Sequence, residues 1–575
     1  MIKRRKKKDS AWVIKVTAME RKGRKIRLGL LVDSLEVQAW VLRCIERVVE
    51  AGVAEISLVV LPRDVATPLP GLASRLVRNR RHLAWHGLRR IENRLAKPSP
   101  DAFEIRSAEK ILAGVPRVAV CPRREKFSDY IEGSDLGRIA EHDIDVFVRF
   151  GFRILRGGIL GLAPGGVWSF HHGDNTQYRG GPPGVWEIFE QNPVTGAVLQ
   201  QLGDGLDAGV VLDRTFCATD FTSVRRGQNG LFWSALSMLP RALVRLDKLG
   251  PDEFFTRARQ QTPKPDTLGK IYREPGNFQT LKLGASLLGR IARRKTVNLL
   301  TRQQWAIMFS LGGGDFRKLD LPSFKMLLPP KDKFWADPHI IQRDGVYHLF
   351  IEEFDRRGGR GHIAWLTIDE AGHCSAPQPI IRQPYHMSYP FVFAHAGELY
   401  MVPETFENRT IELYRCTEFP RKWELHRTLM RDVVAFDPTL LNHSGRWWLF
   451  ANIVETPGAS YNDELFLFSA DEPTSCDWQP HERNPIVSDV RRARPAGRIF
   501  SQAGKLYRPA QDCSGEYGQA LTIQEIQTLT ETQYAEREVA EIKPTWSPKI
   551  KCVHTLSQAG NLTAIDIRLD RRKVL

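Results

Sequence analysis

The strongest constraint on the fold is a recurrence in the second half of the chain. Short runs rich in aromatic and aliphatic residues lie about fifty residues apart at 347–351, 399–402, 447–450 and 506–508, separated by Gly, Pro, Asn and Asp turns. This period is typical of a β-propeller, in which each four-stranded blade buries its faces against its neighbours. Roughly five blades fit after residue 300. Residues 305–310 are a candidate strand for closing the ring against the last blade.

The first part of the chain has a different periodicity. Residues 26–33 form a short apolar run, residues 36–50 have a helical pattern, and residues 54–61 form a second apolar run. This order predicts a strand, a helix and a strand of a parallel sheet. Further strands are expected at 145–150 and 166–170, each followed by a loop rich in Gly, His or Asp. In such sheets ligands bind at the carboxyl ends of the strands, so we expect a site in these loops.

The chain of 575 residues is too long for one core. We predict a basic disordered tail at 1–22, an α/β Rossmann-like domain at 23–215, a helical connector at 216–300 packed on it, and an all-β five-bladed propeller at 301–575. Much of the net charge of +17 is concentrated in a few places, most densely in the tail. Nothing resembles an RNA-recognition, helix-turn-helix or zinc-finger signature, so no nucleic-acid partner is expected.

Eight cysteines are scattered without a Cys-x-x-Cys pair, and no run of about eighteen apolar residues exists. These features predict a soluble, cytoplasmic protein with buried free thiols and no transmembrane segment. The opening strand and helix lack Gly-x-Gly-x-x-Gly, which argues against a dinucleotide. We predict no metal site.

A linked set of motifs in the first domain resembles the formyltransferase family, which includes methionyl-tRNA, glycinamide-ribonucleotide and sugar-nucleotide formyltransferases. The matching residues keep the family's order and spacing: His171, Arg179-Gly180, Thr195-Gly196 and Leu206-Asp207-Ala208-Gly209. The resemblance implies transfer of a formyl group from 10-formyltetrahydrofolate to an amine. His171 would face the developing oxyanion, and Asp207 would hold the histidine and relay the proton that leaves the amine.

The family resemblance also implies further contacts. The loop after the strand at 145–150 would bind the pterin through its backbone, at Gly151, Phe152, Ile154 and Leu155. Asp174, Asn175 and Arg179 would contact the amine acceptor. One position departs from the family, because Ser169 stands where the pattern has asparagine. Either the geometry differs, with His172, Asp174 or Asn175 compensating, or the domain binds without catalysing.

The recurrent strands of the second half carry polar residues at similar places, at Asp337-Pro338, Glu404, Asp437-Pro438 and Arg494 to Arg498. They resemble the N-terminal domain of plant glucosamine inositolphosphorylceramide transferases, itself similar to arabinanase-type and furanosidase-type five-bladed propellers. Those hydrolases use a first-blade aspartate as base, a third-blade aspartate that tunes the partner carboxyl group, and a fourth-blade glutamate as acid. Asp337 and Asp437 fit the first two roles, whereas Arg494 stands where the fourth-blade acid would be. Glu404 would serve as acid only if its blade geometry allowed it.

We therefore expect a carbohydrate-binding propeller, with Asp337, Glu404 and Asp437 as ligand contacts. Arg494 and Arg508 would suit an anionic sugar or a phosphorylated ligand, because guanidinium pairs with carboxylate and phosphate. The combined hypothesis is formyl transfer to an amino sugar or sugar nucleotide, with the propeller binding a glycan-like ligand. Two alternatives stay open at this point: a glycoside hydrolase centred on Asp337 and Asp437, and a non-catalytic glycan-binding protein.

Overall fold

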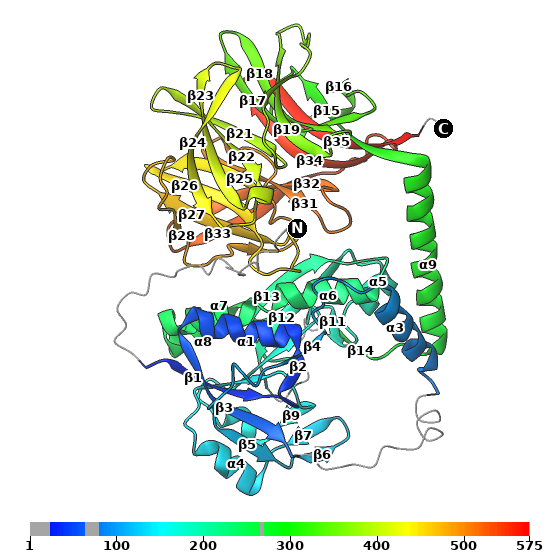
Figure 1. Ribbon diagram of the computed structural model, residues 1–575, viewed down its shortest axis with the longest axis vertical. Coiled ribbons are helices and arrows are strands. Elements are labelled where there is room, and N and C mark those ends of the chain that lie inside the picture. Colours follow the sequence, from blue (N-terminus) through cyan, green and yellow to red (C-terminus); the bar gives the residue numbers. More distant parts are fainter. Residues whose placement is uncertain (1–23, 64–79, 204, 206, 265–268, 574–575) are drawn as a thin grey trace, which may run out of the picture. The chain divides into compact units, whose positions relative to one another are not determined.

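The computed structural model describes residues 24–63, 80–203, 205, 207–264 and 269–573, which divide into two units (Figure 1). The first unit runs to Ala292 and includes Thr456–Ser460, and the second comprises Arg293–Glu455 and Tyr461–Leu575. The predicted basic tail at 1–22 and Leu206 lie outside the described residues. Within the described ranges, no helix is long and apolar enough to cross a membrane.

The first unit is built on a mixed sheet. Its seven described strands follow the order β13-β12-β10-β8-β1-β3-β5. They are β1 (Ile26–Leu31), β3 (Ala54–Pro62), β5 (Arg117–Val120), β8 (Val146–Arg149), β10 (Val167–His171), β12 (Val194–Gln201) and β13 (Val210–Ala218). The five strands from β10 to β5 are parallel, and β12 and β13 are antiparallel. The strands expected at 26–33, 54–61, 145–150 and 166–170 are therefore present as β1, β3, β8 and β10.

The sheet is buried on both faces. Val146 and Val148 of β8 belong to one apolar cluster, whereas Phe147 belongs to another, as the alternation of side chains along a strand requires. The first cluster is completed by α1 (Ala39–Ala51), α6 (Val224–Ala235), α7 (Met238–Leu249) and α8 (Pro251–Gln261). The second is completed by α4 (Gly133–Ala140) and the 3-10 turn η1 (Gly158–Gly161).

The helix expected at 36–50 begins three residues later. Residues Glu36–Gln38 form the short strand β2, which pairs with β4 (Ile105–Ser107). The N–H groups of Ala39 and Trp40 donate to carbonyl oxygens of Glu104 and Ala102. This tertiary pairing holds the chain extended up to Gln38, so α1 starts at Ala39.

Short elements complete the first unit around the strand ends. They are β6 (Arg123–Glu125), β7 (Ser128–Tyr130) and β9 (Ile154–Arg156) in one small sheet, β11 (Tyr178–Gly180) and β14 (Lys270–Tyr272) in another, and α5 (Val185–Glu190). The small sheets tie the loops that follow β8 and β10 to distant parts of the chain.

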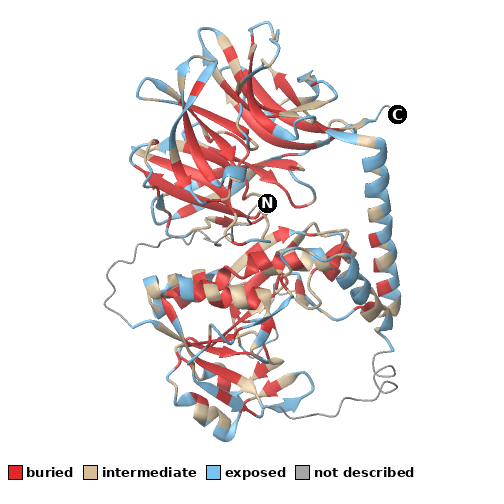
Figure 2. Ribbon diagram, in the orientation of Figure 1, coloured by how far each residue is buried: buried red, intermediate tan, exposed pale blue. Residues whose placement is uncertain are grey.

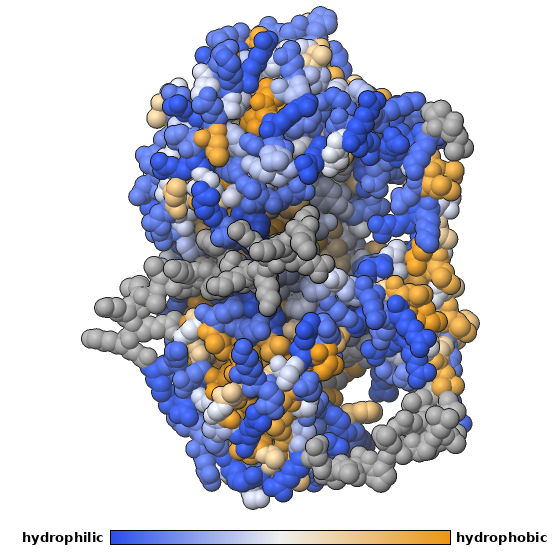
Figure 3. All heavy atoms as spheres, viewed as in Figure 1, coloured by the Kyte–Doolittle hydropathy of each residue, from blue (hydrophilic) through white to orange (hydrophobic). Residues whose placement is uncertain are grey.

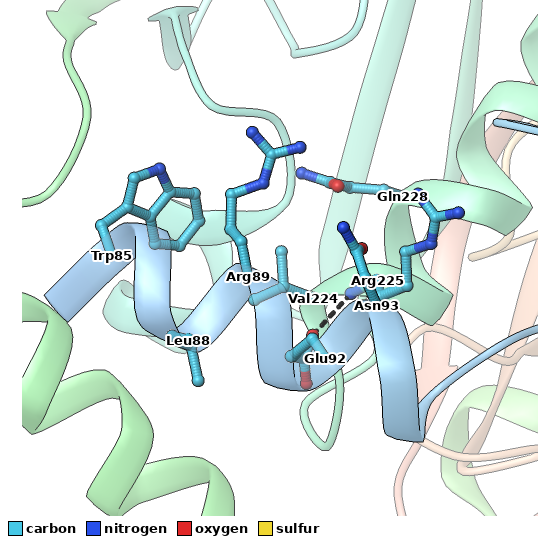
Figure 4. Close-up of a pocket in the computed structure, with 8 residues that line it drawn as sticks. All are labelled: Trp85, Leu88, Arg89, Glu92, Asn93, Val224, Arg225 and Gln228. Atoms are coloured by element: carbon cyan, nitrogen blue, oxygen red, sulfur yellow. Dashed lines mark hydrogen bonds between the residues drawn. The ribbon is translucent and has the colours of Figure 1, made fainter. Parts of the chain in front are cut away.

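A small pocket lies between α3 (Leu83–Leu95) and α6, lined by Trp85, Leu88, Arg89, Glu92, Asn93, Val224, Arg225 and Gln228 (Figure 4). A carboxylate oxygen of Glu92 accepts from the N–H of Arg225 at 2.8 Å and from the hydroxyl of Ser223 at 3.3 Å. The first N–H groups of a helix have no acceptor within it, and the helix dipole favours negative charge there. Glu92 therefore caps the N-terminus of α6 from the neighbouring helix.

Replacing Glu92 with alanine should lower the free energy of unfolding of the first unit by about 1 kcal/mol, because the cap and its charge are both lost. Glu92→Gln keeps an oxygen acceptor and loses only the charge, so it should cost less. Urea unfolding of both variants measures the difference. Wild-type stability in Glu92→Ala would contradict the capping role.

The second unit is a five-bladed β-propeller. Blade 1 contains β17 (Lys333–Arg343), β18 (Val346–Asp355), β19 (Arg360–Ile368) and β20 (Gln378–Ile381). Blade 2 contains β21 (Ser388–His395), β22 (Glu398–Thr405), β23 (Thr410–Glu418) and β24 (Lys422–Arg431). Blade 3 contains β25 (Ala435–His443), β26 (Arg446–Ile453), β27 (Glu464–Ala470), β28 (Gln479–Pro480) and β29 (Val487–Ser488). Blade 4 contains β30 (Phe500–Gln502), β31 (Lys505–Asp512), β32 (Ala520–Leu529) and β33 (Tyr534–Ile542).

The fifth blade joins the two ends of the propeller sequence. Its sheet runs β16-β15-β35-β34, with β15 (Thr301–Ser310), β16 (Lys325–Leu327), β34 (Ile550–Ala559) and β35 (Leu562–Arg572). Strand β15 pairs with β35 from Thr301↔Arg572 to Ser310↔Thr563. The expected closure by residues 305–310 is therefore present, and it hydrogen-bonds the last blade to the first strand of the ring. Figure 2 shows that the inner strands of the blades are mostly buried.

The helix α9 (Asn277–Leu300) precedes β15. Thr280, Leu283 and Leu287 are buried on one side of it. Other apolar side chains on α9 are exposed: Phe278, Leu281, Leu288, Leu299 and Leu300. Figure 3 shows orange, apolar atoms along this helix. All eight cysteines are free thiols, but Cys121 and Cys476 are exposed, so the expectation of uniformly buried thiols is wrong for these two.

Candidate functional site

The ends of β8 and β10 bring three polar side chains to one face of the sheet. The parallel register pairs Ser169 directly with Arg149. His171 lies two residues beyond Ser169, so its side chain is on the same face. The intervening Phe170 packs against the first apolar cluster, on the other face of the sheet, which agrees with this alternation. Arg149, Ser169 and His171 therefore line one face at the carboxyl end of the parallel strands, where α/β proteins bind ligands.

His171 and Asp207 lie together at this edge. Nδ1 of His171 is 3.5 Å from a carboxylate oxygen of Asp207. Nε2 of the same ring is 3.0 Å from the carbonyl oxygen of Tyr178. The other carboxylate oxygen of Asp207 accepts from the N–H of Gly180 at 2.9 Å, which fixes the aspartate. The two residues expected to act as a pair are thus adjacent, with Asp207 in the left-handed backbone region at a φ of 48°.

The loop after His171 is held by its own hydrogen bonds. Asp174 accepts from the N–H of Thr176 at 2.9 Å and from its hydroxyl at 2.7 Å. A Cβ on Gly196 would lie 3.0 Å from that of Asp174, so the glycine of the Thr-Gly motif allows this close approach. Asn175 is fully buried, and both polar atoms of its side chain lack a partner among the described residues. Asp174 therefore orders the loop, and its contact with an acceptor stays a prediction.

The side chains of Arg179 and His172 contact other groups, although Tyr178 and Gly180 on either side of Arg179 both bond the pair. Arg179 belongs to β11, and its guanidinium reaches the carbonyl of Gly269 at 3.5 Å. His172 stacks on Phe232 with ring centroids 3.5 Å apart, and burial lowers its pKa to about 3. His172 is therefore a neutral packing group on the face opposite His171.

The loop expected to bind a pterin is fixed through its amide groups. The N–H groups of Gly151, Phe152, Arg153 and Ile154 donate to Leu31, Asp33, Asp129 and Phe127 respectively. A Cβ on Gly151 would meet the backbone nitrogen of Asp33 at 2.3 Å, so only glycine fits there. The side chain of Leu155 is buried in the second cluster. Four hydrogen bonds therefore hold the loop in place and engage its amide N–H groups.

Glu187 of α5 is a buried carboxyl group close to Asp174, in the loop after His171. Its burial, reinforced by Glu190 and Asp174, raises its pKa from 4.5 to about 7. Between these values the folded protein keeps a proton that the unfolded chain has released, so the free energy of unfolding should fall as pH rises from 4.5 to 7 and level off above 7. Glu187→Gln should remove this part of the slope. Denaturant titrations at a series of pH values measure it, and an unchanged slope in the variant would contradict the assignment.

The propeller carries a second cluster of polar residues around its inner strands. The inner strands of the first three blades each have a bulge at the same place, where Asp337, Tyr389 and Asp437 have φ values of 52°, 46° and 49° and precede a proline. In blade 4, Arg494 precedes a proline at the corresponding place. In blade 5, one of the register shifts of β34 lies between Val553 and Leu556 and includes His554. The repeated bulge places one polar or aromatic side chain from each blade near the others.

Carboxylates from the second strands fix these bulges. A carboxylate oxygen of Asp566 on β35 accepts from the N–H of Asp337 at 2.8 Å. In the same way Glu404 on β22 accepts from the N–H of Asp437 at 3.0 Å. The same device therefore links blade 5 to blade 1 and blade 2 to blade 3. Burial and the adjacent Asp437 raise the pKa of Glu404 well above its usual range.

Arg494 is already paired with protein groups. Its Nε donates to Asp437 at 2.6 Å, and its Nη1 donates to Asn462 at 3.0 Å. Its guanidinium also lies over the rings of Phe436, Tyr461 and Tyr517. Arg508 lies elsewhere, fully buried inside blade 4 with two hydrogen bonds to Glu536 at 2.9 and 2.8 Å. The structure thus brings Asp337, Glu404, Asp437 and Arg494 together but leaves Arg508 out.

Asp337, His554 and Asp566 form a buried triad. Their ligand atoms lie within 4.8 Å of one another, a spacing that could hold a metal ion. Burial disfavours the charged imidazole, but Asp566 and Asp337 outweigh it and raise the pKa of His554. The imidazolium can therefore supply the positive charge between the two carboxylates itself.

Sequence reasoning missed several residues of both clusters. Tyr389 precedes Pro390 at the same offset as Asp337 and Asp437, so the repeat could have revealed it. His554 and Asp566 have no proline signal, and 229 residues separate Asp566 from Asp337. Arg149 ends an otherwise apolar strand run, and only the register of β8 with β10 places it beside Ser169. These positions depend on strand pairing that a linear pattern does not give.

Comparisons with known proteins find two kinds of relative. Residues 328–551 match the family model described as glucosamine inositolphosphorylceramide transferase 1, N-terminal. The rice (Oryza sativa subsp. japonica) glucosamine inositolphosphorylceramide transferase 1 is 35% identical over 206 residues, which is 35% of this chain and 27% of that protein. A methionyl-tRNA formyltransferase of Synechococcus sp. (strain CC9311) is 39% identical over 70 residues, which is 12% of this chain and 20% of that protein.

The chain spans about a quarter of the length of the plant relatives, 27% of the rice protein. Among solved structures, the catalytic domain of a Coprinopsis cinerea GH62 α-L-arabinofuranosidase is 14% identical with a TM-score of 0.32, and the match covers 47% of this chain and 97% of that domain. Both kinds of relative are transferases by name. The second half is therefore related in sequence to part of a sugar-lipid transferase, and a short segment is related to a formyltransferase.

Proposed function

We propose that the first unit moves a formyl group from 10-formyltetrahydrofolate to an amine on an amino sugar or sugar nucleotide. The observation that carries this proposal is the adjacency of His171 and Asp207 at the carboxyl ends of parallel strands, at the positions of the formyltransferase motif. The similarity of a 70-residue segment to a methionyl-tRNA formyltransferase supports it. The sugar acceptor is inferred from the propeller that the same chain carries.

The reaction requires one bond to form and one to break. The amine nitrogen attacks the formyl carbon, and negative charge collects on the formyl oxygen of the tetrahedral intermediate. Asp207, oriented by the N–H of Gly180 and facing His171, takes the proton that the amine nitrogen loses. The C–N10 bond then breaks, and N10 of tetrahydrofolate receives this proton. The products are a formamide and tetrahydrofolate, and nothing is oxidised.

The donor would be held by the loop after β8. The amide N–H groups from Gly151 to Ile154 are all used within the protein, which leaves carbonyl oxygens as the loop's recognition groups. Carbonyl oxygens are the acceptors that the amino and ring N–H groups of a pterin need. The loop therefore fits the donor's pterin, and its rigidity would reduce the entropic cost of binding.

The propeller is proposed to bind a glycan-like ligand without cleaving it. Cleavage by two carboxylates needs a proton donor on the leaving oxygen. Arg494 stands at the fourth-blade position of that donor, and its charge is already paired with Asp437. This pairing favours binding over hydrolysis, and it favours a neutral sugar over the anionic ligand first expected. Release of a chromogenic furanoside leaving group dependent on Asp337 would instead establish the hydrolase.

The test is transfer of an isotope-labelled formyl group from 10-formyltetrahydrofolate to a panel of free amino sugars and amine-bearing sugar nucleotides, with matched N-acetylated compounds as controls. We expect label on one or more of the free amines and none on the acetylated controls. Saturable binding of a sugar without transfer to any amine would support the non-catalytic alternative.

A further inference from the structure

The position of the family's asparagine is occupied by two residues acting together. Ser169 has a shorter side chain than asparagine and is almost fully buried. Its hydroxyl accepts a hydrogen bond from Nη1 of Arg149 at 2.8 Å. The register that pairs Ser169 with Arg149 places the guanidinium on the same face as His171. A small residue at 169 thus leaves room beside it for the arginine at 149.

The side-chain donors of His171 and Ser169 are already engaged. Nε2 of His171 faces the carbonyl of Tyr178 at 3.0 Å, and Nδ1 faces Asp207 at 3.5 Å. The hydroxyl of Ser169 is within 3.3 Å of the carbonyl of Phe170, to which it donates. Neither side chain therefore has a free N–H or O–H for a new negative charge in this conformation. An acyl transfer site needs such a donor where charge develops.

Arg149 has donors to spare. A guanidinium carries five N–H groups. One donates to Ser169, and Nη2 makes only a long contact of 3.5 Å with the carbonyl of Phe152. The buried Nε has no partner among the described residues. The side chain as a whole is half-buried, so other parts of it are accessible.

The charge environment keeps Arg149 cationic. Burial lowers its pKa, and the carboxylates of Asp207, Asp33 and Asp129 oppose this shift. Arginine remains protonated under all ordinary conditions. Arg149 is therefore a fixed cation that interacts electrostatically with Asp207. It is the last residue of β8, the strand that leads into the proposed donor loop.

We propose that Arg149 is a further catalytic residue, whose guanidinium donates to the formyl oxygen as it becomes an oxyanion, in the role that the family's asparagine fills. This inference rests on the proposed formyl transfer. When the amine nitrogen bonds to the formyl carbon, the electron pair of the C=O bond moves to oxygen and is met by the N–H groups of Arg149. The pair returns when the C–N10 bond breaks, and the proton follows the path through Asp207.

The test uses Arg149→Met, which keeps the length of the stem, and Arg149→Lys, which keeps a charge without the planar fork. The substrates are 10-formyltetrahydrofolate and the best amine of the acceptor panel, or water if donor hydrolysis to formate is the faster reaction. We expect Arg149→Met to lose about a hundredfold in kcat. Arg149→Lys should lie between it and wild type. Affinity for a stable 10-formyltetrahydrofolate analogue and the melting temperature should stay unchanged.

A second substitution that restores the rate distinguishes a catalytic role of Arg149 from a structural one. The double variant Arg149→Met with Ser169→Asn restores the family's residue and should recover at least tenfold of the lost rate. Arg106→Ala, an exposed arginine of the same unit, is the control and should be neutral. Wild-type kcat in Arg149→Met, or failure of the double variant to recover any rate, would overturn the role of Arg149 while formyl transfer stands. No donor turnover by the wild type would instead remove the proposed function and this inference with it.

Discussion

Asp207→Asn should reduce kcat for formyl transfer by about a thousandfold while leaving the fold intact. Asparagine retains an oxygen to accept from the N–H of Gly180, at 2.9 Å in the native protein, so the local backbone should keep its course. The substitution removes the charge that faces Nδ1 of His171 at 3.5 Å and the base that takes the amine proton. Single-turnover kinetics with the labelled donor measures the chemical step separately from product release.

The matched control is Asp213→Asn. Asp213 lies on β13 of the same unit and pairs with Arg245, away from His171. It should retain the wild-type rate, and any loss in it would measure the effect of removing a carboxylate from this sheet. A wild-type rate in Asp207→Asn would contradict the assignment of the catalytic pair.

Arg508→Met should destabilise the propeller by about 3–5 kcal/mol, the largest stability effect that we expect in this unit. The side chains of Arg508 and Glu536 are 1% and 3% exposed, and Arg508 donates twice to this carboxylate. Removal of Arg508 leaves the buried carboxylate with only the more distant guanidinium of Arg492, at 3.9 Å, as counter-charge. Differential scanning calorimetry of the full chain measures the shift in the transition of the propeller.

The double variant Arg508→Met with Glu536→Gln tests the cause. Glutamine carries no charge that would be left buried and unpaired. Its carbonyl can still accept from the hydroxyl of Tyr534, which donates to Glu536 in the native protein. We expect most of the lost stability to return. A double variant as unstable as Arg508→Met would show that packing of the arginine, rather than its charge, stabilises blade 4.

The architecture was more accessible from sequence than the sites. The aromatic runs at 347–351, 399–402, 447–450 and 506–508 are the second strands of blades 1 to 4, because burial on both faces of each blade imposes a repeated apolar pattern. Closure by β15 followed from the same reasoning. The start of α1 was placed too early, because pairing of β2 with β4 is a tertiary contact that local propensity does not contain.

The sites were only partly predictable. Asp337, Glu404, Asp437 and Arg494 carry a repeat signal and do meet in space. Arg508 was expected beside them, but its strand turns its side chain into blade 4, where Glu536 neutralises it. Because side chains on a strand alternate between faces, one residue of register decides whether an arginine meets a ligand or an internal carboxylate.

Arg149 is a residue that the motif did not indicate and that strand register places at the site. The motif identifies Ser169 as a departure from the family, and the predicted compensation lies within the same loop, at His172, Asp174 or Asn175. In the structure His172 stacks on Phe232 and Asp174 bonds Thr176, whereas the group that bonds Ser169 comes from the neighbouring strand. Compensation between paired strands is invisible to motif spacing and becomes evident only from the register.

Formyl transfer by the first unit requires that it bind a formyl donor at the edge formed by β8 and β10. The most direct measurement is calorimetric titration of the full-length protein with a stable 10-formyltetrahydrofolate analogue, beside Asp207→Asn. We expect saturable binding of one analogue per chain at micromolar affinity, a free energy of about −8 kcal/mol. The affinity should be similar in the variant, because Asp207 acts on the acceptor's proton. Absence of saturable binding up to about 1 mM in both proteins would rule out the donor site and leave the propeller as the candidate functional unit.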